Sequence, residues 1–297
     1  MNIPDHDLDA FIEEARGLIG VEYGLYKREF LKRCIQNRMR RLHFEELSQY
    51  RDLLKSDKDE QGHFRRGISI YHTEFVRDPL KFRVLEEQVV PEILEKKKVE
   101  RKLRIWSAGC AGGEETYSIA MVVREVLGDK APLWDVKVHG TDINAELVRK
   151  ARSGEYGRDE FIKKAEDKYH VEKYVVSEGD VFRVNESIRR MVEFGVHDLM
   201  RDEGLPGMDI IFCRNVLIYF QQKATRAALE KFYSALANGG YLFLGNSEVI
   251  EDFFYCKYKK LKSFGEFYYR KIEAGSAEHR EMEVKKRNIQ AGLGYEL

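Results

Sequence analysis

The hydrophobic positions of the chain follow one pattern before about residue 100 and another after it. Up to about Ile70, apolar residues recur at helical spacing, as Leu8, Phe11 and Ala15 do. This spacing predicts helices over 8–18, 26–42 and 45–54, in a bundle of no more than four short helices. A further helical segment is predicted over 79–98, where Pro91 is expected to kink or divide it.

From about residue 102 onward, short apolar strands alternate with helical stretches. The alternation predicts an α/β fold with a mostly parallel sheet and helices on both of its faces. The expected strands are 103–107, 136–141, 191–196, 208–213 and 241–245, and the expected helices are 115–127, 145–153 and 221–237. The last helix is expected to end at Asn238-Gly239-Gly240. Two aromatic-rich strands, 253–261 and 266–271, lie close enough in sequence to require an antiparallel hairpin.

The interval from about 155 to 190 does not fit a simple crossover between parallel strands. Its short apolar runs, Tyr174–Val176 and Val181–Val184, are parted by Ser177–Asp180, which indicates a small inserted β subdomain. The tail from 273 to 297 is charged and poor in large apolar residues, which is typical of a mobile segment or a solvated helix. The expected organisation is a helical domain over 1–70, a linker and helix over 71–100, a larger domain over 101–272 and the tail.

Composition narrows the possible partners. The 297 residues include 51 basic and 51 acidic side chains, so no overall charge attracts the protein to nucleic acid or to an anionic membrane. No apolar run approaches the roughly 18 residues of a membrane span, and the amino terminus is acidic. We therefore expect a cytoplasmic protein without membrane insertion. The four cysteines stand far apart without metal-ligand spacing, so we expect reduced thiols and no metal.

Candidate chemistry centres on residues 104–118, RIWSAGCAGGEETYS, where a strand runs through a glycine-rich turn into a helix. Such a turn holds a nucleotide-type cofactor. A pyrophosphate needs bare backbone N–H groups there, and Glu114 and Glu115 would each oppose its charge by about 1 kcal/mol or more. S-adenosylmethionine carries an ammonium and a sulfonium instead, and is favoured. The alternative is that both glutamates only complement the helix dipole.

Further polar residues follow the other predicted strands, where an open parallel sheet binds its ligands. They are Asp142 after the second strand, His197-Asp198-Leu199 after the third and Cys213-Arg214-Asn215 after the fourth. Asp142 is the natural acceptor for the ribose hydroxyls. The alternative is that Asp142 only caps the helix that begins near Asn144.

Several segments taken together resemble the chemotaxis receptor methyltransferases (CheR-type), over nearly the whole chain except the tail. They are TEFVR at 73–77, RIWSAGCAGGEETYS at 104–118, GTDIN at 140–144, ARSGEY at 151–156, IFCRNVLIYF at 211–220 and GNSE at 245–248. The resemblance implies a Rossmann-like S-adenosylmethionine-dependent sheet with a small inserted β subdomain, preceded by a small all-α domain. It also implies methyl transfer to glutamate side chains of bacterial chemoreceptors, with S-adenosylhomocysteine as the product.

Position by position, the resemblance implies roles for particular side chains. Glu114 or Glu115 would face the methionyl group and Asp142 the ribose. The other cofactor-binding residues that it implies are Thr73, Arg77, Ile143, Asp198, Leu199, Cys213, Arg214 and Asn215. Arg77 and Tyr219 would face the transferred methyl group. The alternative for Tyr219 is core packing beside Ile218 and Phe220. The chain departs from the asparagines common in the family at Tyr71 and Asp198.

Seven basic residues between Lys27 and Arg41 share one sign on a chain without net charge. In the family, a basic helix of this domain faces the acidic methylation helices of the receptor. The resemblance therefore implies docking of a chemoreceptor cytoplasmic domain, at receptor arrays, through Lys32, Arg33, Arg38, Arg40 and Arg41. A solvated helix face is the alternative.

Three other functions remain open at this level. They are a nicotinamide-dependent dehydrogenase, a methyltransferase acting on another protein or a small molecule, and a non-catalytic module that binds the cofactor for signalling. The glutamates after the glycine turn argue against the dehydrogenase, because its cofactor carries a pyrophosphate.

Overall fold

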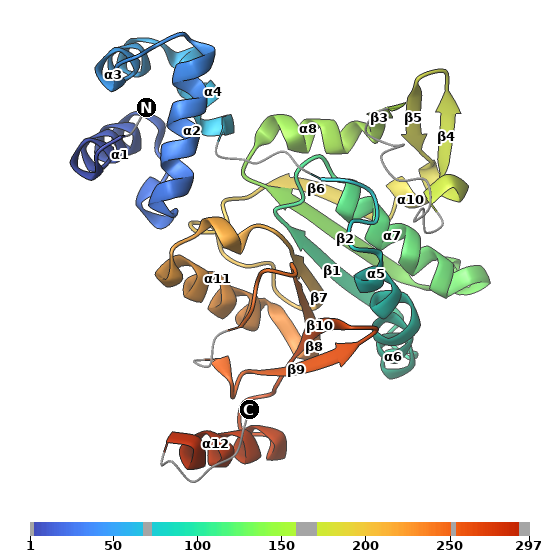
Figure 1. Ribbon diagram of the computed structural model, residues 1–297. Coiled ribbons are helices and arrows are strands. Elements are labelled where there is room, and N and C mark those ends of the chain that lie inside the picture. Colours follow the sequence, from blue (N-terminus) through green and yellow to red (C-terminus); the bar gives the residue numbers. More distant parts are fainter. Residues whose placement is uncertain (1–2, 68–72, 159–170, 251–253, 291–297) are drawn as a thin grey trace. The chain divides into compact units, whose positions relative to one another are not determined.

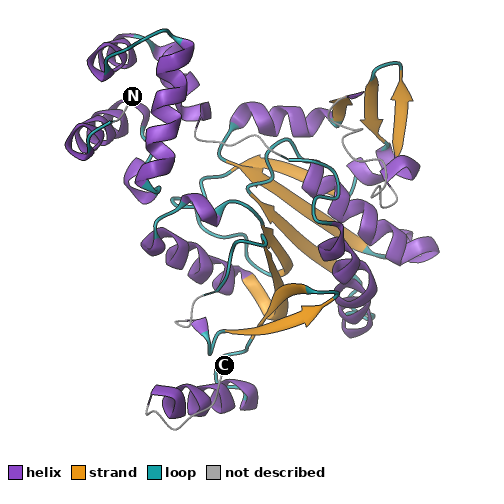
Figure 2. Cartoon of the chain, viewed as in Figure 1, coloured by secondary structure: helices purple, strands orange, loops and turns teal. Residues whose placement is uncertain are grey.

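The computed structural model describes residues 3–67, 73–158, 171–250 and 254–290. The chain divides into two compact units. The first consists of Met1–Tyr71 and Leu217–Ala227, and the second consists of His72–Val216 and Ala228–Leu297. Figure 1 identifies the elements of each unit, and Figure 2 shows that both sheets belong to the second.

The amino-terminal part of the first unit is helical, as its apolar spacing predicts. Its helices are α1 (Asp5–Ile19), α2 (Arg28–Arg41), α3 (Leu47–Ser56) and α4 (Lys58–Gly67), with a short 3₁₀ turn at Tyr23–Leu25. Phe11, Tyr50 and Phe64 are buried and pack ring against ring, with centroids 5.3–6.1 Å apart. Burial of such aromatic rings supplies most of the stability that short helices lack by themselves.

The predicted interruption at Pro91 is confirmed. The helix α5 (Pro79–Val84) passes into a π-helical turn over Leu85–Val89 and then into α6 (Val90–Lys96). A proline inside a helix has no N–H to donate and its ring crowds the preceding turn, so a wider turn just before Pro91 relieves both problems.

The main sheet has seven strands in the order β6-β2-β1-β7-β8-β10-β9. The strands are β1 (Lys102–Ala108), β2 (Asp135–Asp142), β6 (Val192–Val196), β7 (Met208–Cys213), β8 (Leu236–Leu244), β9 (Tyr258–Ser263) and β10 (Glu266–Lys271). The first five pair in parallel, whereas β10 is antiparallel to both β8 and β9. The predicted α/β class and the predicted hairpin are both confirmed.

The sheet is covered on both faces by helices (Figure 1). The helices after β1, β2 and β7 are α7 (Glu114–Leu127), α8 (Ala145–Ser153) and α11 (Gln222–Ala235). Along β1, Leu103 and Ile105 pack into the core that includes α7, whereas Trp106 packs edge-on to Phe232 of α11, at 5.5 Å between ring centroids. Successive side chains of a strand point to opposite faces, so β1 is buried on both.

The predicted β insertion is confirmed as a separate three-stranded antiparallel sheet in the order β3-β5-β4. Its strands are β3 (Glu155–Gly157), β4 (Val175–Glu178) and β5 (Val181–Val184), and the short helix α10 (Glu186–Arg189) leads back to β6. Residues 159–170 of the predicted insertion lie outside the described residues.

Predicted boundaries are wrong at two places after β7. Helix α11 ends at Ala235 instead of Ala237, because Leu236 already pairs with Met208 at the start of β7. The register then shifts before Ile210 pairs with Tyr241, so the Asn238–Gly240 run lies in an irregular part of β8, with Gly239 at φ 72°. The strand predicted from 253 begins only at Tyr258, because the amide of Lys257 closes a turn onto the carbonyl of Phe254.

The tail contains the helix α12 (Ala277–Gln290), whose Glu278 accepts from Lys259 of β9 and Arg270 of β10. Within the described ranges, no helix combines the length and the apolar character that crossing a membrane requires.

Candidate active site

The candidate site lies where the order of the parallel strands reverses. Strand β1 pairs with β2 on one side and with β7 on the other, and the chain continues outward from each. Ligands of open α/β sheets bind beyond the carboxyl ends of the strands at such a point. The glycine turn follows β1 here, and Arg214 follows β7.

The backbone amides of the glycine turn are largely used inside the protein. Gly109 and Cys110 both donate to the carbonyl of Thr141, at 2.7 and 2.9 Å. The amide of Ala111 donates to the carboxylate of Asp142 (2.9 Å), and that of Gly113 donates to the carbonyl of Cys110 (3.0 Å). A pyrophosphate is held by free N–H groups at this position. These four amides are therefore not available to a phosphate group.

Asp142 connects the turn to the end of β2. One carboxylate oxygen accepts from Ala111 and the other accepts from the amide of Asn144, at 2.9 Å. The N-cap of α8 is Asn144, whose side chain accepts from the amides of Glu146 and Leu147. The N-cap alternative for Asp142 is therefore wrong. The ribose contact of Asp142 stays a prediction. Ile143, which follows Asp142 and is half-buried, also stays a predicted cofactor-binding residue.

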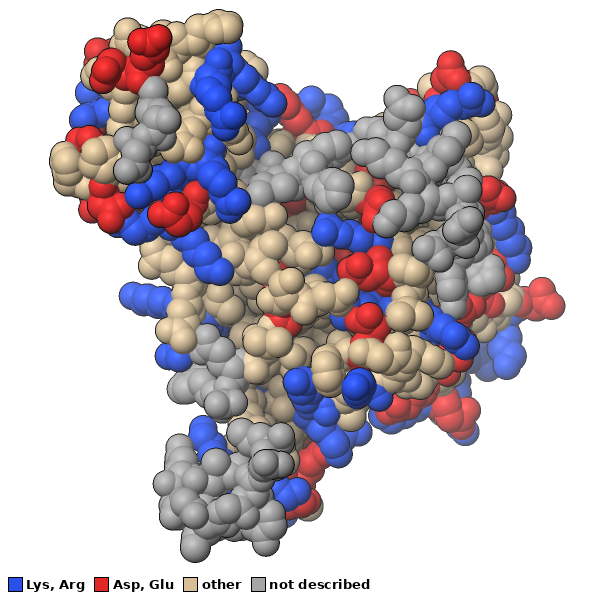
Figure 3. Space-filling model, in the orientation of Figure 1, with Lys and Arg blue, Asp and Glu red and all other residues tan. Residues whose placement is uncertain are grey.

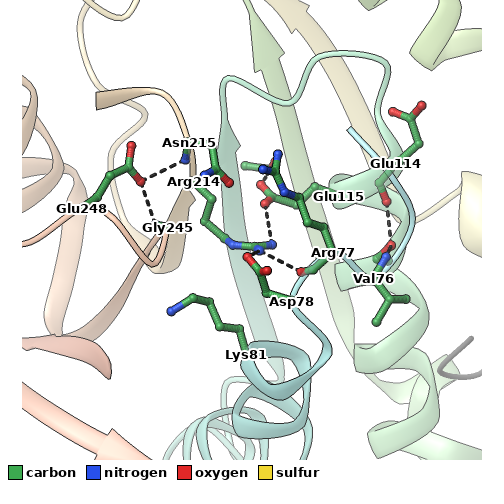
Figure 4. Close-up of polar contacts among 12 residues, drawn as sticks. Val76, Arg77, Asp78, Lys81, Glu114, Glu115, Arg214, Asn215, Gly245 and Glu248 are labelled. Atoms are coloured by element: carbon green, nitrogen blue, oxygen red, sulfur yellow. Dashed lines mark hydrogen bonds and ion pairs between the residues drawn. The ribbon is translucent and has the colours of Figure 1, made fainter. Parts of the chain in front are cut away.

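Glu114 is buried at the start of α7, and the side chain of Glu115 is only 14% exposed, so neither is simply a solvated acid in a first turn. Glu115 accepts from the hydroxyl of Ser107 at 2.8 Å and from Arg214 at 3.1 Å. Burial raises the pKa of Glu115, and Arg214 offsets part of that rise. Figure 4 shows the Glu115 carboxylate facing Arg214, whereas the Glu114 carboxylate points away from it.

Arg214 holds three segments together (Figure 4). Its side chain is only 1% exposed, and it donates to Glu115, to the carboxylate of Asp78 and to the carbonyl of Arg77, the last at 2.7 Å. The guanidinium carbon also lies 5.7 Å from the centre of the Phe82 ring. A buried guanidinium is stable only with such partners.

The segment that carries Arg77 is conformationally strained. Val76 and Asp78 have φ values of 51° and 56°, a region that a β-branched residue such as valine rarely adopts. The amide of Val76 donates to the hydroxyl of Ser118 at 3.0 Å, and Arg214 fixes the next two residues. Sequence reasoning missed Asp78. Its place directly after Arg77 in the TEFVR segment was the available signal.

The loop after β6 carries Asp198 and Leu199. One carboxylate oxygen of Asp198 accepts from the amides of Met200 and Arg201, at 2.9 and 3.4 Å, and so caps the loop's own turn. The carbonyl of Leu199 accepts from Lys231 of α11 at 2.5 Å. The loop is thus ordered by the protein itself, and its contact with adenine stays a prediction.

The remaining cofactor candidates lie in the same unit. Cys213 is fully buried at the end of β7, and burial raises the pKa of its thiol. Asn215 has φ 60°, and Thr73 is half-buried. Tyr71 lies outside the described residues. Among the residues that the structure describes, no group of three or more His, Cys, Asp or Glu side chains is arranged to hold a metal ion.

Tyr219 belongs to the first unit, whereas Arg77 belongs to the second. Tyr219 closes a 3₁₀ turn over Leu217–Tyr219, its ring lies 4.7 Å from that of Phe30, and its carbonyl accepts from the amide of Lys27 at 2.8 Å. Tyr219 is only half-buried, whereas the neighbouring Phe220 is buried. Tyr219 is therefore only partly in the core, and its catalytic role stays a prediction.

The basic residues of α2 fall into two groups. Lys32 pairs with Asp5 at 2.8 Å, and Arg38 pairs with Glu60, which is buried and also accepts from Tyr50. These two cations serve the helical unit itself. The exposed cations of the predicted docking set are Arg33, Arg40 and Arg41. Figure 3 shows Lys and Arg side chains gathered on one side of the helical unit in this view.

Comparison with known families gives two matches that together span most of the chain. Residues 71–263 match the family described as "CheR methyltransferase, SAM binding domain". Residues 6–69 match the family described as "CheR methyltransferase, all-alpha domain".

Curated relatives include proteins of similar length and one much longer protein. The chain is 33% identical over 250 residues to the chemotaxis protein methyltransferase of Listeria monocytogenes, covering 84% of this chain and 92% of that one. It is 32% identical over 236 residues to the chemotaxis protein methyltransferase of Escherichia coli, covering 77% and 79%. An uncharacterized 104.1 kDa protein of Rhodobacter capsulatus is 34% identical over 226 residues, which cover 76% of this chain and 23% of that protein.

The raised pKa of Glu115 predicts how one substitution depends on pH. A carboxyl group with a raised folded-state pKa contributes full stability below its unfolded value, about 4.3, and loses that contribution as pH rises through the folded value. Glu115→Gln cannot ionise. The free energy of unfolding of Glu115→Gln should therefore increase relative to that of the wild type as pH rises above about 4.3, as measured by urea unfolding.

Glu278→Gln is the control, because its stability relative to the wild type should change with pH in the opposite direction. A hydrogen bond from Lys259 lowers the pKa of Glu278, so its contribution is present at neutral pH and lost in acid. The Glu278→Gln variant should become less stable relative to the wild type as pH rises. Equal slopes for the two variants would contradict the assignment of Glu115.

Proposed function

Because the chain belongs to the CheR methyltransferase family, we propose that it transfers methyl groups from S-adenosylmethionine to glutamate side chains of bacterial chemoreceptors. The products are glutamyl methyl esters and S-adenosylhomocysteine, and the reaction serves chemotaxis adaptation at receptor arrays. The relatives named chemotaxis protein methyltransferase support this substrate. The observation that carries the proposal is the glycine turn, whose amides are used internally and whose neighbours are buried carboxylates.

The residues present fit S-adenosylmethionine. Its reactive part is a methyl group on a positively charged sulfur, and an ammonium lies nearby. Glu114 and Asp142 are buried carboxylates around the turn, and Glu115 beside them is half-buried; carboxylates stabilise such cations where water is largely excluded. We assign the acceptance of a ribose hydroxyl to Asp142 at the end of β2. The hydrogen bonds of Arg214 to Glu115 and Asp78 hold the segments around the site in place.

The proposed chemistry needs positioning more than proton transfer. A glutamate carboxylate, with a pKa of about 4.3, is already ionised at neutral pH and attacks without a general base. Orientation of two reactants can contribute roughly 7–11 kcal/mol of the barrier reduction. We assign the orientation of the attacking carboxylate to Arg77, through its positive charge, and to Tyr219, through its hydroxyl. The strain at Val76 and Asp78 supports this role, because strained backbone concentrates at functional sites.

Receptor docking is assigned to the exposed cations Arg33, Arg40 and Arg41 of α2. Charges of one sign on a rim steer association with an oppositely charged partner, and their effect falls with ionic strength. The acidic methylation helices of a chemoreceptor are such a partner.

The first test is transfer of radiolabelled methyl groups from S-adenosylmethionine to chemoreceptor cytoplasmic fragments. We expect label that is released as methanol by mild base, as an ester requires, and no label on a fragment whose methyl-accepting glutamates are alanine. Cofactor binding without transfer would favour the non-catalytic module. Base-stable label, or label on another class of acceptor only, would favour a different methyltransferase, and calorimetry with a nicotinamide dinucleotide tests the dehydrogenase.

Arg77→Ala and Tyr219→Phe test the catalytic assignment. Each should lower kcat by about 10²-fold, the cost of misplacing a reacting group by about 1 Å. Arg83→Ala is the matched control, because Arg83 is an exposed arginine of α5 that pairs with Glu87 one turn away. Initial rates on the receptor fragment provide the measurement. Wild-type turnover in both site variants would remove Arg77 and Tyr219 from the catalytic machinery.

Arg33→Glu/Arg40→Glu tests the docking assignment. Reversal should weaken receptor methylation by about tenfold at low salt and reduce its salt dependence, with binding of S-adenosylmethionine unchanged. The control is Lys98→Glu/Lys130→Glu, which changes net charge equally at two exposed lysines of the second unit. Equal loss in the two double variants, or no loss in the first, would end the docking proposal.

A further inference from the structure

Glu248 follows β8 and is buried, with 7% of its surface exposed. One carboxylate oxygen accepts from the amides of Asn215 and Gly245, at 2.9 and 2.7 Å. The other oxygen accepts from the amide of Val216 at 2.9 Å. Figure 4 shows the carboxylate directed at the loop that follows β7. The side chain therefore fastens the carboxyl ends of the adjacent strands β7 and β8 together.

The surrounding backbone is shaped around this carboxylate. A Cβ atom at Gly245 would lie 2.7 Å from one carboxylate oxygen of Glu248 and 2.9 Å from the amide nitrogen of Asn215. Both distances are too short for a side chain. Asn215 also has φ 60°, a left-handed conformation that asparagine adopts more readily than most residues. The hydrogen bonds from Asn215 and Val216 to Glu248 hold this conformation.

The two neighbours of Asn215 each reach a different part of the candidate site. Arg214 binds Glu115 and the Arg77–Asp78 segment. Val216 packs against the glycine turn, because a Cβ atom at Gly109, where φ is 79°, would lie 2.5 Å from a methyl carbon of Val216. The conformation of one three-residue loop thus determines where two separate parts of the site lie.

We propose that Glu248 is a positioning residue for the cofactor site, which it shapes by fixing the Arg214–Val216 loop. The inference rests on the proposed function for the identity of the ligand. In this role Glu248 acts through hydrogen bonds to backbone amides, and its charge makes no direct contribution to holding the cofactor's cation.

The test compares Glu248→Gln and Glu248→Asp with the wild-type full chain. A glutamine retains one acceptor oxygen, so its NH₂ group must face at least one of the three N–H donors. An aspartate keeps the charge but withdraws both oxygens by one methylene group. Each variant should bind S-adenosylmethionine and S-adenosylhomocysteine with Kd raised by roughly ten- to hundredfold, as loss of buried hydrogen bonds predicts. Isothermal calorimetry with both ligands gives the values.

Asp209→Asn is the matched control for stability. Asp209 is a buried carboxylate at the opposite end of β7, where it accepts from Lys97 and from the amide of Arg104 at 2.8–2.9 Å. Urea unfolding should show that this variant loses at least as much stability as the Glu248 variants, while calorimetry should show Kd values within about twofold of the wild type.

Each outcome decides for or against the proposal. Wild-type affinity in Glu248→Gln would overturn it, as would an equal loss of affinity in Asp209→Asn. Loss of affinity for the cationic S-adenosylmethionine alone, with full rescue by Glu248→Asp, would show that the charge acts directly and would also overturn it. If Glu248→Gln does not fold, the same comparison of Kd values is made between Glu248→Asp and Asp209→Asn. Failure of the wild type to bind either ligand would instead contradict the proposed function.

Discussion

The buried guanidinium of Arg214 is the interaction on which the candidate site depends. An unpaired charge in this position would be strongly destabilising, so the three acceptors around it are structural requirements. Those acceptors come from the segment before α5 and from the start of α7, while Arg214 itself follows β7. One side chain therefore fixes the relative positions of three segments that are more than thirty residues apart in sequence. Their backbone conformations, including the strained ones at Val76 and Asp78, are held by that requirement.

The second constraint is the sign of the charge at the carboxyl edge of the sheet. Parallel sheets of this kind commonly bind phosphate groups at the turn after the first strand, through free amides and a helix dipole. Here the amides donate to Thr141, Asp142 and Cys110, and glutamates occupy the first turn of the helix. The acidic side chains at this edge of the sheet favour a cation over an anion. This local difference, and not the fold, selects the class of cofactor.

Sequence patterns predicted much of the second unit because its strands and helices have clear periods. Strand β7 and helix α8 were predicted with the residues that the structure shows, and the β insertion was inferred from two short apolar runs. The errors at Ala235 and Tyr258 arose where strand pairing begins inside a segment with helical or aromatic character. The sequence did not predict roles for Asp78 and Glu248, although both lie in or beside the segments that resemble the family. Their hydrogen-bond donors in the loop after β7 are distant in sequence. The ion pairs of Lys32 with Asp5 and of Arg38 with Glu60 could not be predicted for the same reason, because these partners meet only in the folded helical unit.

The division of the chain into units has a consequence for modularity. The helical unit includes Leu217–Ala227, a segment encoded far from its other helices, in which Phe220 and Tyr219 pack on Tyr26 and Phe30. A fragment that stops near residue 71 would lack these partners and would expose aromatic surface. The boundary between the two family matches is therefore not a boundary between independent folding units. Part of the aromatic packing of the helical unit is therefore encoded within the sequence of the domain that carries the candidate site.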